Sequence, residues 1–478
     1  SDVCSSDLER CSMSKKSMKI KELFSGQATQ IEGEVTVRGW IRNHRKQKNM
    51  GFIELYDGSC FKSLQLVYTA EQDADGKLKG LRNGACIEVT GIVQPGFQKE
   101  LIELNVKDVL LLGDCTEDYP LQPKRHSIEF LRENAYLRPR TRLFQAVFRV
   151  RSVAAQAIHT YFTERGFLYV NTPLITANDA EGAGNTFTVT TLDIADVKSG
   201  DKKTFEEICK DDFFGRHASL AVTGQLEAEV FAMAFGDVYT FGPTFRAEHS
   251  NTKTHAAEFW MIEPEMAFCD LEQLMDVEED FLKTILVYII EKCDDELTFL
   301  ENFTKLPLRE RMKKVIHSQI ARVSHKEAIR ILRESGEQFE FEPKYGEDTA
   351  KEHEKYLTEK HFKAPVFIYD WPKDIKAFYM YQNDDEQTVG AVDLLVPGAG
   401  ELMGGSQRET RYDRLLARMN ELGISADSMW WYLNLCRYGA CEHAGFGMGF
   451  ERLLIYVTGM ENIRDVIPFH RTQGNCEY

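Results

Sequence analysis

The sequence predicts an α+β protein that begins with a small β-barrel and continues into a larger domain built on an antiparallel sheet. Five short β-prone runs, separated by Gly, Asn and Asp, crowd into residues 34–113. From residue 141 to the C-terminus, strand-like and helical patterns alternate irregularly, without the regularity of βαβ units. No GxGxxG follows a strand-like run, and neither GxxxxGKS nor GxxxxGKT occurs, which excludes Rossmann and P-loop folds.

The composition is that of an ordinary globular protein with room for two or more domains. The chain has 478 residues, of which 43% are hydrophobic and 28% charged. No stretch approaches the roughly 20 apolar residues that a membrane-spanning helix needs. The 11 cysteines are scattered, without a CxxC pair or a Cys/His cluster. This usage argues against a zinc module and a secreted disulfide framework, so we expect a cytoplasmic protein in a reducing compartment.

Four segments are expected along the chain. The first has no clear structural period and is expected to be non-native or disordered, with translation starting at Met13 or Met18. The second is the barrel. The third contains three prolines and little periodicity, which predicts a hinge. The fourth is the larger domain. The expected bounds are 1–18 for the N-terminal segment, 19–115 for the barrel, 116–140 for the hinge and 141–478 for the larger domain.

The barrel has features of a nucleic-acid-binding surface. Five short strands fit a Greek-key barrel of the OB type, which binds nucleic acid through stacking aromatics and positive charge. Phe52 and Gln65 lie on two of the predicted strands, although a Phe in a barrel strand could equally belong to the core. Although the net charge of −17 disfavours a polyanion partner overall, residues 33–50 form a local basic stripe with a single acid. A solvated hairpin loop is the alternative for this stripe, whose members are Arg38, Arg42, Arg45, Lys46 and Lys48.

A charged loop, FRAEHSNTKTHAAEF at 245–259, lies between two strand-like segments and has no helical or strand period. The combination of side chains suits a nucleoside triphosphate. Arg246 can grip a phosphate oxygen, and Glu248 can accept from an exocyclic amine. Phe259 can offer a ring face to a purine. An ion-paired surface hairpin is the alternative.

A second constellation is DLLVPGAGELMGGSQR at 393–408. Asp393 and Glu401 are two carboxylates in an otherwise apolar, Gly-rich segment, and Mg²⁺ prefers one or two carboxylates plus phosphate oxygens. Arg408 follows a Gly-Gly pair that lets the backbone approach a ligand closely. Acids flanking a hairpin turn are the alternative.

A third constellation is GFGMGFERLLIY at 445–456. Alternating glycines in a strand indicate a bulge or a ligand close to the backbone. Arg452 would project from the start of the following helix toward that ligand. Tight packing of a strand on a helix is the alternative.

Together and in this order, these segments resemble the motifs of class II aminoacyl-tRNA synthetases. The predicted helix at 141–166 and the strand ending in Pro173 resemble motif 1. The loop at 245–259 resembles motif 2, and GFGMGFERLL resembles motif 3. The preceding barrel resembles that of the subgroup for aspartate, asparagine and lysine.

Three further stretches resemble the asparaginyl members of this subgroup: EGAGNTF at 181–187, VTGQLEAE at 222–229 and the closing PFHRTQGNCEY. The resemblance covers about residues 20–478. It implies an OB-fold anticodon-binding domain, a class II catalytic domain and a homodimer formed through motif 1. It also implies an asparaginyl-tRNA synthetase, which activates asparagine with ATP and Mg²⁺ to the adenylate and transfers it to tRNA(Asn).

The resemblance also implies roles for individual residues. Arg246 would bridge the substrate carboxylate and the α-phosphate, and Arg452 would hold the γ-phosphate. In the barrel, the residues matching the anticodon site are Arg42, Phe52 and Gln65. The other implied sites are ATP contacts at Glu248, His255, Phe259 and Glu401; Mg²⁺ ligands at Asp393 and Glu401; and asparagine contacts at Glu181, Gln225, Glu229 and Arg408.

The choice of amino acid depends on the helix that follows Gln225. Aspartyl enzymes have a lysine where this chain has Ala228, and Glu229 comes next. An acid suits an amide NH₂ and repels a carboxylate, which favours asparagine. The sequence departs from the asparaginyl pattern at Asn185, where an acid is usual. In the tail it departs from the usual Pro, Pro, Ala and Phe at His470, Gln473, Cys476 and Tyr478.

Three alternatives remain open from the sequence. An aspartyl-tRNA synthetase, including one that charges both tRNAs, is disfavoured by Ala228 and Glu229. An ammonia-dependent asparagine synthetase would lack the barrel. A non-catalytic nucleic-acid-binding module would be expected to have lost Arg246, Asp393, Glu401 or Arg452. Whether residues 190–215 form an ordered insertion or a mobile lid is also open.

Overall fold

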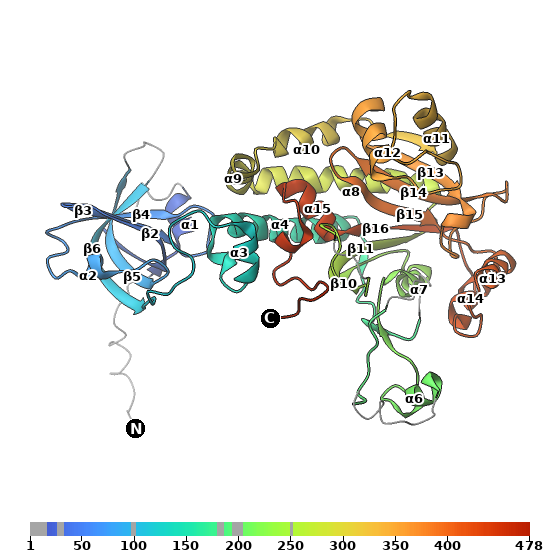
Figure 1. Ribbon diagram of the computed structural model, residues 1–478, viewed down its shortest axis with the longest axis horizontal. Coiled ribbons are helices and arrows are strands. Elements are labelled where there is room, and N and C mark those ends of the chain that lie inside the picture. Colours follow the sequence, from blue (N-terminus) through green and yellow to red (C-terminus); the bar gives the residue numbers. More distant parts are fainter. Residues whose placement is uncertain (1–16, 26–32, 97–101, 179–185, 194–203, 249–251) are drawn as a thin grey trace, which may run out of the picture. The chain divides into compact units, whose positions relative to one another are not determined.

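A computed structural model describes most of the chain, which divides into two compact units, Ser1–Ala146 and Val147–Tyr478 (Figure 1). The expected non-native or disordered segment lies outside the described residues except at its end, where Ser17–Met18 form a short strand. The described residues are 17–25, 33–96, 102–178, 186–193, 204–248 and 252–478.

The first unit contains the predicted barrel. Its sheet has the order β1-β2-β3-β4-β6-β5, and a second pairing of β2 with β5 closes it. Side chains that alternate inward along the strands, such as Val37, Ile53 and Leu66, are fully buried and form its core. The predicted OB-type barrel is therefore confirmed. Its elements are β1 Ser17–Met18, α1 Ile20–Phe24, β2 Glu34–Lys46, β3 Met50–Tyr56, β4 Leu64–Thr69, α2 Lys77–Gly80, β5 Cys86–Pro95 and β6 Ile102–Gly113.

The segment expected to be a hinge carries helical structure. It contains α3 (Ile128–Glu133) and the short helix η2 (Arg138–Arg140). Helix α3 begins because Ser127 caps it, with Oγ accepting from the backbone N of Phe130 at 3.1 Å. The periodicity of so short a helix is too brief to be visible among the three prolines.

The second unit is built on an eight-stranded sheet with the order β12-β13-β14-β15-β16-β11-β10-β7. The pairs from β13 through β10 are antiparallel, and β12 and β7 add to the two edges in parallel. The predicted α+β domain on an antiparallel sheet is therefore confirmed. The strands are β7 Leu168–Tyr169, β10 Asp237–Phe245, β11 Glu258–Ala267, β12 Ala321–Ser324, β13 Val366–Pro372, β14 Thr388–Val396, β15 Gly400–Gln407 and β16 His443–Gly449.

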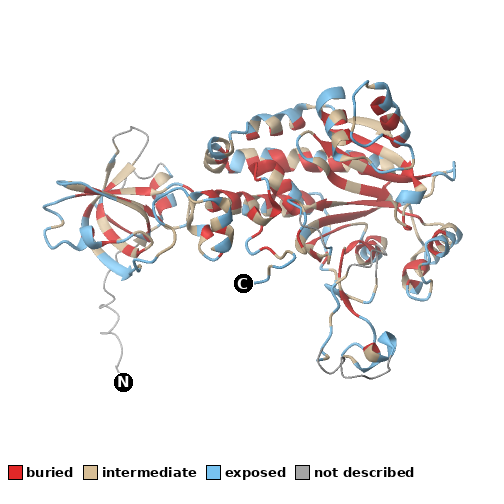
Figure 2. Ribbon diagram, in the orientation of Figure 1, coloured by how far each residue is buried: buried red, intermediate tan, exposed pale blue. Residues whose placement is uncertain are grey.

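Helices pack against this sheet and bury its apolar side chains (Figure 2). Helix α8 lies against β14, β15 and β16, where the rings of Phe281 and Phe446 are 5.6 Å apart. Helix α7 packs on β10 and β11, and α15 packs on β11 and β16. The helices are α4 Arg142–Glu164, α6 Phe205–Asp211, α7 Gln225–Phe235, α8 Leu271–Lys292, α9 Asp294–Thr304, α10 Leu308–His317, α11 His325–Glu334, α12 Lys351–Lys355, α13 Tyr412–Glu421, α14 Trp430–Arg437 and α15 Phe450–Thr458, with short helices η3 Tyr356–His361, η4 Lys373–Ile375 and η5 Ile463–Asp465.

A second, two-stranded sheet pairs β8 (Ile175–Thr176) with β9 (Ser219–Leu220). Of the 190–215 segment, the described part includes helix α6, whose cap Thr204 accepts from the backbone N of Glu207 at 3.3 Å. Among the helices in the described ranges, none is long and apolar enough to cross a membrane.

Candidate active site

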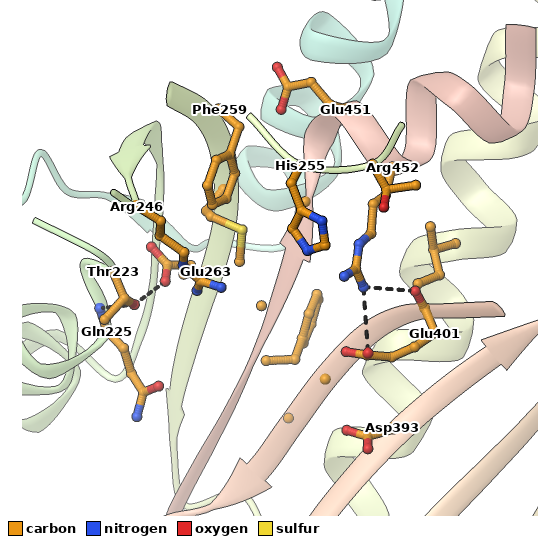
Figure 3. A pocket seen from close by; sticks show the side chains of 18 of the residues that line it. Thr223, Gln225, Arg246, His255, Phe259, Glu263, Asp393, Glu401, Glu451 and Arg452 are labelled. Carbon is orange, nitrogen blue, oxygen red and sulfur yellow. Dashed lines mark hydrogen bonds and ion pairs between the residues drawn. The ribbon is translucent and has the colours of Figure 1, made fainter. Parts of the chain in front are cut away.

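The three charged segments meet around one cavity of about 300 Å³ in the second unit (Figure 3). Strand β11 follows the charged loop, and its neighbour β16 carries the alternating glycines, with Met261 opposite Gly449. Strand β15 pairs with the other side of β16. Segments about 200 residues apart in the sequence therefore lie side by side because their strands are neighbours in the sheet. The predicted residues that line the cavity are Gln225, Arg246, Glu248, His255, Phe259, Asp393, Glu401, Arg408 and Arg452.

One part of the cavity is formed by the ends of β10 and β11. Phe259 lies opposite Thr244 in the strand pair, and the backbone N of Arg246 donates to Ala257 O at 3.0 Å. This register puts the Arg246 guanidinium carbon 5.5 Å from the centroid of the Phe259 ring. His255 Nε2 lies 4.0 Å from a carboxylate oxygen of Glu248. A flat aromatic face beside a guanidinium suits a purine nucleotide and its phosphates.

Asp393 and Glu401 lie on the paired strands β14 and β15, and each has one oxygen beside a cation. Asp393 Oδ2 is 2.9 Å from Lys376 Nζ, and Glu401 Oε2 is 3.5 Å from Arg452 Nη1. The other two oxygens face a common space over Gly404. A Cβ placed on this glycine would lie 3.2 Å from Asp393 Oδ1 and 3.4 Å from Glu401 Oε1.

This arrangement fits Mg²⁺ shared with a ligand. In the described part of the chain, no group of three or more His, Cys, Asp or Glu side chains could hold a metal by itself. Mg²⁺ is commonly held by one or two carboxylates together with substrate phosphates. Burial raises the pKa of Asp393 to about 6, with Glu401 adding to the effect and Lys376 opposing it. A cation in this space would offset the repulsion between the two acids.

Another part of the cavity contains a buried ion pair. Arg408 donates from Nε and Nη2 to the two carboxylate oxygens of Glu265, at 3.2 and 2.5 Å. The two side chains are 3% and 0% exposed, yet both border the cavity. Burial raises the pKa of Glu265 to about 7, and the Arg408 guanidinium opposes this shift. The pair offers a donor and an acceptor side by side, which is the complement of a carboxamide.

The sequence analysis missed Glu265, although a glycine marks its position. Glu265 lies opposite Gly445 in the strand pair, and a Cβ on that glycine would lie 2.3 Å from Glu265 Oε1. The first glycine of GFGMG thus leaves room for a buried carboxylate. From the sequence alone, the alternating glycines of GFGMG indicate only a nearby ligand or a bulge.

Gln225 and Glu263 border the cavity near the start of α7. Glu263 accepts from Thr223 Oγ1 and from the backbone N of Gly224, the latter at 3.0 Å. The sequence analysis missed Glu263, which stands beside Glu265 around Pro264 in strand β11, because no spacing distinguishes these acids from surface charges. The predicted partner of Gln225, Glu181, lies outside the described residues.

Glu229 lies one helical turn after Gln225, and its carboxylate is only 1% exposed. It accepts from Gln225 Nε2 at 3.0 Å, Tyr432 OH at 2.8 Å and His443 Nε2 at 3.0 Å. Although burial opposes it, hydrogen bonding and charge from His443 and Arg408 lower the pKa of Glu229. The structure therefore puts Glu229 behind the residues that border the cavity.

The first unit has its own hollow, of about 400 Å³, on the barrel surface. Phe52 is half-buried there and lies outside the barrel core, with the Arg45 guanidinium 5.6 Å from its ring centroid. Gln65 accepts from Arg45 Nη2 at 3.4 Å and donates to Glu103 at 2.7 Å. Both predicted residues thus border this hollow.

Arg42, the third predicted anticodon residue, does not itself border this hollow but contacts Ser63 and Glu54, which do. Its side chain is 12% exposed, and its Nη1 donates to Ser63 Oγ at 2.6 Å. Its Nη2 donates to Gln145. Burial lowers the pKa of Arg42 despite the nearby Glu54.

Comparisons with known proteins agree with this architecture. The sequence profile of the tRNA synthetases class II (D, K and N) matches residues 127–473, and that of the OB-fold nucleic acid binding domain matches residues 35–112. The chain therefore belongs to the class II tRNA synthetases of the aspartate, lysine and asparagine group, as the motifs indicated.

Within this class, the chain belongs to the asparagine–tRNA ligases. That of Acholeplasma laidlawii is 54% identical, with 96% of this chain and 99% of the relative covered. That of Bacillus cytotoxicus is 52% identical with the same coverage. The asparaginyl-tRNA synthetase of Pyrococcus horikoshii, complexed with asparaginyl-adenylate, superposes with a TM-score of 0.83 at 28% identity, covering 96% of this chain and 99% of that one. The asparaginyl interpretation is confirmed over the aspartyl, asparagine-synthetase and non-catalytic alternatives.

Proposed function

We propose that this chain activates asparagine with ATP to asparaginyl-adenylate and transfers the asparaginyl group to tRNA(Asn). The observation that carries the proposal is the buried Arg408–Glu265 pair beside a cavity that also contains an aromatic face and an acid pair. A carboxamide would accept from Arg408 through its oxygen and donate to Glu265 through its NH₂. A carboxylate in the same place would face Glu265 with like charge, which disfavours aspartate.

The activation step needs alignment and charge neutralisation more than a base. A carboxylate oxygen of asparagine attacks the α-phosphorus, the new C–O–P linkage forms, and the bond to pyrophosphate breaks. Arg246, beside Phe259, is the residue we assign to the α-phosphate, with adenine on the Phe259 ring. Arg452, at the start of α15, is assigned to the terminal phosphate. Glu248 and His255 complete the nucleotide contacts from the same loop.

We assign the α-amino group of asparagine to Gln225 and Glu263, with Glu181 as a further contact. Their amide and carboxylate oxygens are acceptors for an ammonium. Glu229 would then act by holding Gln225, since its carboxylate already accepts from the Gln225 amide. Asp393 and Glu401 would hold Mg²⁺, which when bound screens the charge of the phosphates.

The barrel of the first unit, over residues 19–115, is proposed to bind the anticodon. Support comes from the half-buried Phe52 ring beside Arg45 and from Gln65, whose amide faces the same hollow. An aromatic ring with a neighbouring cation is a suitable platform for an unstacked base. Arg42 would support this surface from within, through Ser63 and Gln145.

We further propose a homodimer in the cytoplasm. Strand β7 is at the sheet edge, and the apolar side chains on and after it are exposed: Leu168, Tyr169, Leu174 and Ile175 are 41–44% accessible. Clustered apolar exposure beside an unpaired strand edge favours association with a second chain. Sedimentation of the purified protein tests this part.

ATP–pyrophosphate exchange with each of the common amino acids tests the substrate. Asparagine is expected to drive exchange, and aspartate is expected to be discriminated against by a large factor, because the wrong side chain leaves Glu265 facing a like charge. Comparable exchange with both would overturn the assignment. Aminoacylation of tRNA(Asn) but not tRNA(Asp) tests the second step.

A further inference from the structure

Lys376, directly after η4, is held against the acid pair of the cavity. Its Nζ lies 2.9 Å from Asp393 Oδ2, and the two side chains are 16% and 14% exposed. The same ammonium lies 4.0 Å from the centroid of the Trp371 ring. Trp371 is itself fixed, because it is buried and its Nε1 donates to Ile368 O at 2.9 Å. Lys376 is thus confined between an indole face and a carboxylate.

This contact determines which oxygen of Asp393 faces the cavity. With Oδ2 against Lys376, Oδ1 points to the space over Gly404, which Glu401 Oε1 also faces. The terminal torsion of a free carboxylate is broad, so both oxygens could otherwise exchange places. An ion pair at one oxygen leaves the other as a single, directed ligand.

Lys376 also supplies positive charge in an acidic neighbourhood. The charges of Glu401 and Asp348 both act on Asp393. Behind the sheet lies the fully buried Glu278, but burial raises its pKa well above the ordinary value, so it is a neutral acid and adds no charge to this group. A Cβ on Gly405, the neighbour of Gly404, would lie 2.7 Å from Glu278 Oε1. Lys376 is the cation in direct contact with Asp393 within this group.

We propose that Lys376 is a positioning residue for the divalent cation that accompanies the nucleotide: it aims one oxygen of Asp393 at the cation, and its charge reduces the repulsion between the surrounding acids and the nucleotide phosphates. This role of Lys376 rests on the proposed function, because it requires that the cavity bind a metal–nucleotide complex. The opposite interpretation is that the ammonium takes the place of the cation and competes with it. The two interpretations predict effects of opposite sign when the charge is removed.

The first test measures metal binding directly. Mn²⁺ is titrated into the full chain with an excess of a non-hydrolysable ATP analogue and followed by electron paramagnetic resonance. Lys376→Met is expected to weaken Mn²⁺ binding about tenfold, the usual effect of losing a partner of a metal ligand. Lys376→Arg should recover most of the affinity. Unchanged or tighter binding by Lys376→Met overturns the proposal.

Lys373→Met is a matched control, because Lys373 begins the short helix that ends just before Lys376, and it pairs with Glu421 at 3.6 Å. It should leave Mn²⁺ binding unchanged, and a loss equal to that of Lys376→Met overturns the proposal. Thermal unfolding without metal checks that each variant folds. If Lys376→Met does not fold, Lys376→Gln keeps only an uncharged donor to Asp393, so weaker Mn²⁺ binding is still expected, by less than tenfold, and unchanged binding overturns the proposal.

The second readout separates positioning from a general structural effect. In asparagine-dependent pyrophosphate exchange, Lys376→Met should raise the Mg²⁺ concentration for half-maximal rate, and saturating Mg²⁺ should restore kcat to within about twofold. A lower kcat with an unchanged Mg²⁺ requirement contradicts the proposal. Absence of exchange in the unaltered protein would refute the proposed function instead, and the Mn²⁺ comparison would still stand.

Discussion

Two regions of the same cavity hold their charges in different ways. The Arg408–Glu265 pair has side chains 3% and 0% exposed and a contact of 2.5 Å. The Arg452–Glu401 pair has side chains 44% and 44% exposed and a contact of 3.5 Å. The first pair is desolvated and fixed, whereas the second is hydrated and adjustable.

The difference follows from what each region has to recognise. A small uncharged amide is distinguished from an acid by groups that are already desolvated, because an unpaired polar group is most costly there. A polyphosphate with a metal brings its own strong charges, so exposed side chains can rearrange around it. We therefore expect the fixed geometry of Arg408 and Glu265 to determine stability and amino-acid specificity. In the region of Arg452 and Glu401, we expect only the charges of the side chains to matter for binding.

The largest expected effect is from Glu265→Ala. It removes the acid that accepts two hydrogen bonds from the buried Arg408 and leaves Glu229, 3.9 Å away, to compensate the charge. The free energy of unfolding should fall by about 3–5 kcal/mol, because breaking a buried ion pair is costly. Urea denaturation measures this loss, and pyrophosphate exchange with asparagine should fall with it. A loss under about 1 kcal/mol would remove the contrast between the two regions.

Glu401→Ala is the corresponding change in the exposed region. An exposed ion pair contributes about 0–1 kcal/mol, so the free energy of unfolding should change little. The rate of adenylate formation should nevertheless fall at limiting Mg²⁺ and partly recover as Mg²⁺ rises. Normal exchange at limiting Mg²⁺ would show that Glu401 is not a metal ligand.

Phe52→Ala extends the comparison to the first unit. Loss of one base–aromatic stack should weaken aminoacylation by about 1–3 kcal/mol. Exchange without tRNA should be unchanged, because the adenylate forms in the second unit. Phe52 is half-buried and outside the core, so the melting of the barrel should shift much less than for a core Phe. Early melting of the barrel with unchanged aminoacylation would assign Phe52 a packing role instead.

The smallest effect is a dependence of specificity on pH. With a pKa of about 7, Glu265 loses its charge as the pH falls from 8 to 6. The like-charge penalty against aspartate should then decrease, so the ratio of aspartate to asparagine exchange should rise toward acid pH. Because the folded-state pKa lies above the ordinary Glu value of 4.5, the same group stabilises the folded state fully below about pH 4.5 and loses that contribution as the pH rises from there to about 7. A flat ratio over this range would mean that Arg408 keeps Glu265 ionised.

The sequence by itself determined the two-part fold and most of the nucleotide site. Short alternating strands with Gly and Asn between them specify a barrel, since the side-chain period of a strand is local. Arg246, Glu248 and Phe259 stood out because a loop between two strands carried charges without any period. Asp393, Glu401 and Arg452 stood out as charges within Gly-rich apolar runs.

Only the tertiary structure decided which of these charges are paired and which face the cavity. Arg408 and Glu265 are 143 residues apart, and the register of β11 against β16 and of β15 against β16 brings them into contact. Glu229, favoured by the sequence as a direct contact, lies one turn of α7 after Gln225, where Tyr432 and His443 donate to it and it does not border the cavity. No pattern in the sequence identifies Lys376 as a site residue, because its partner Asp393 is 17 residues away on a different element. Pattern in a sequence reports local geometry, whereas the partners of buried charges are set by how the strands are aligned.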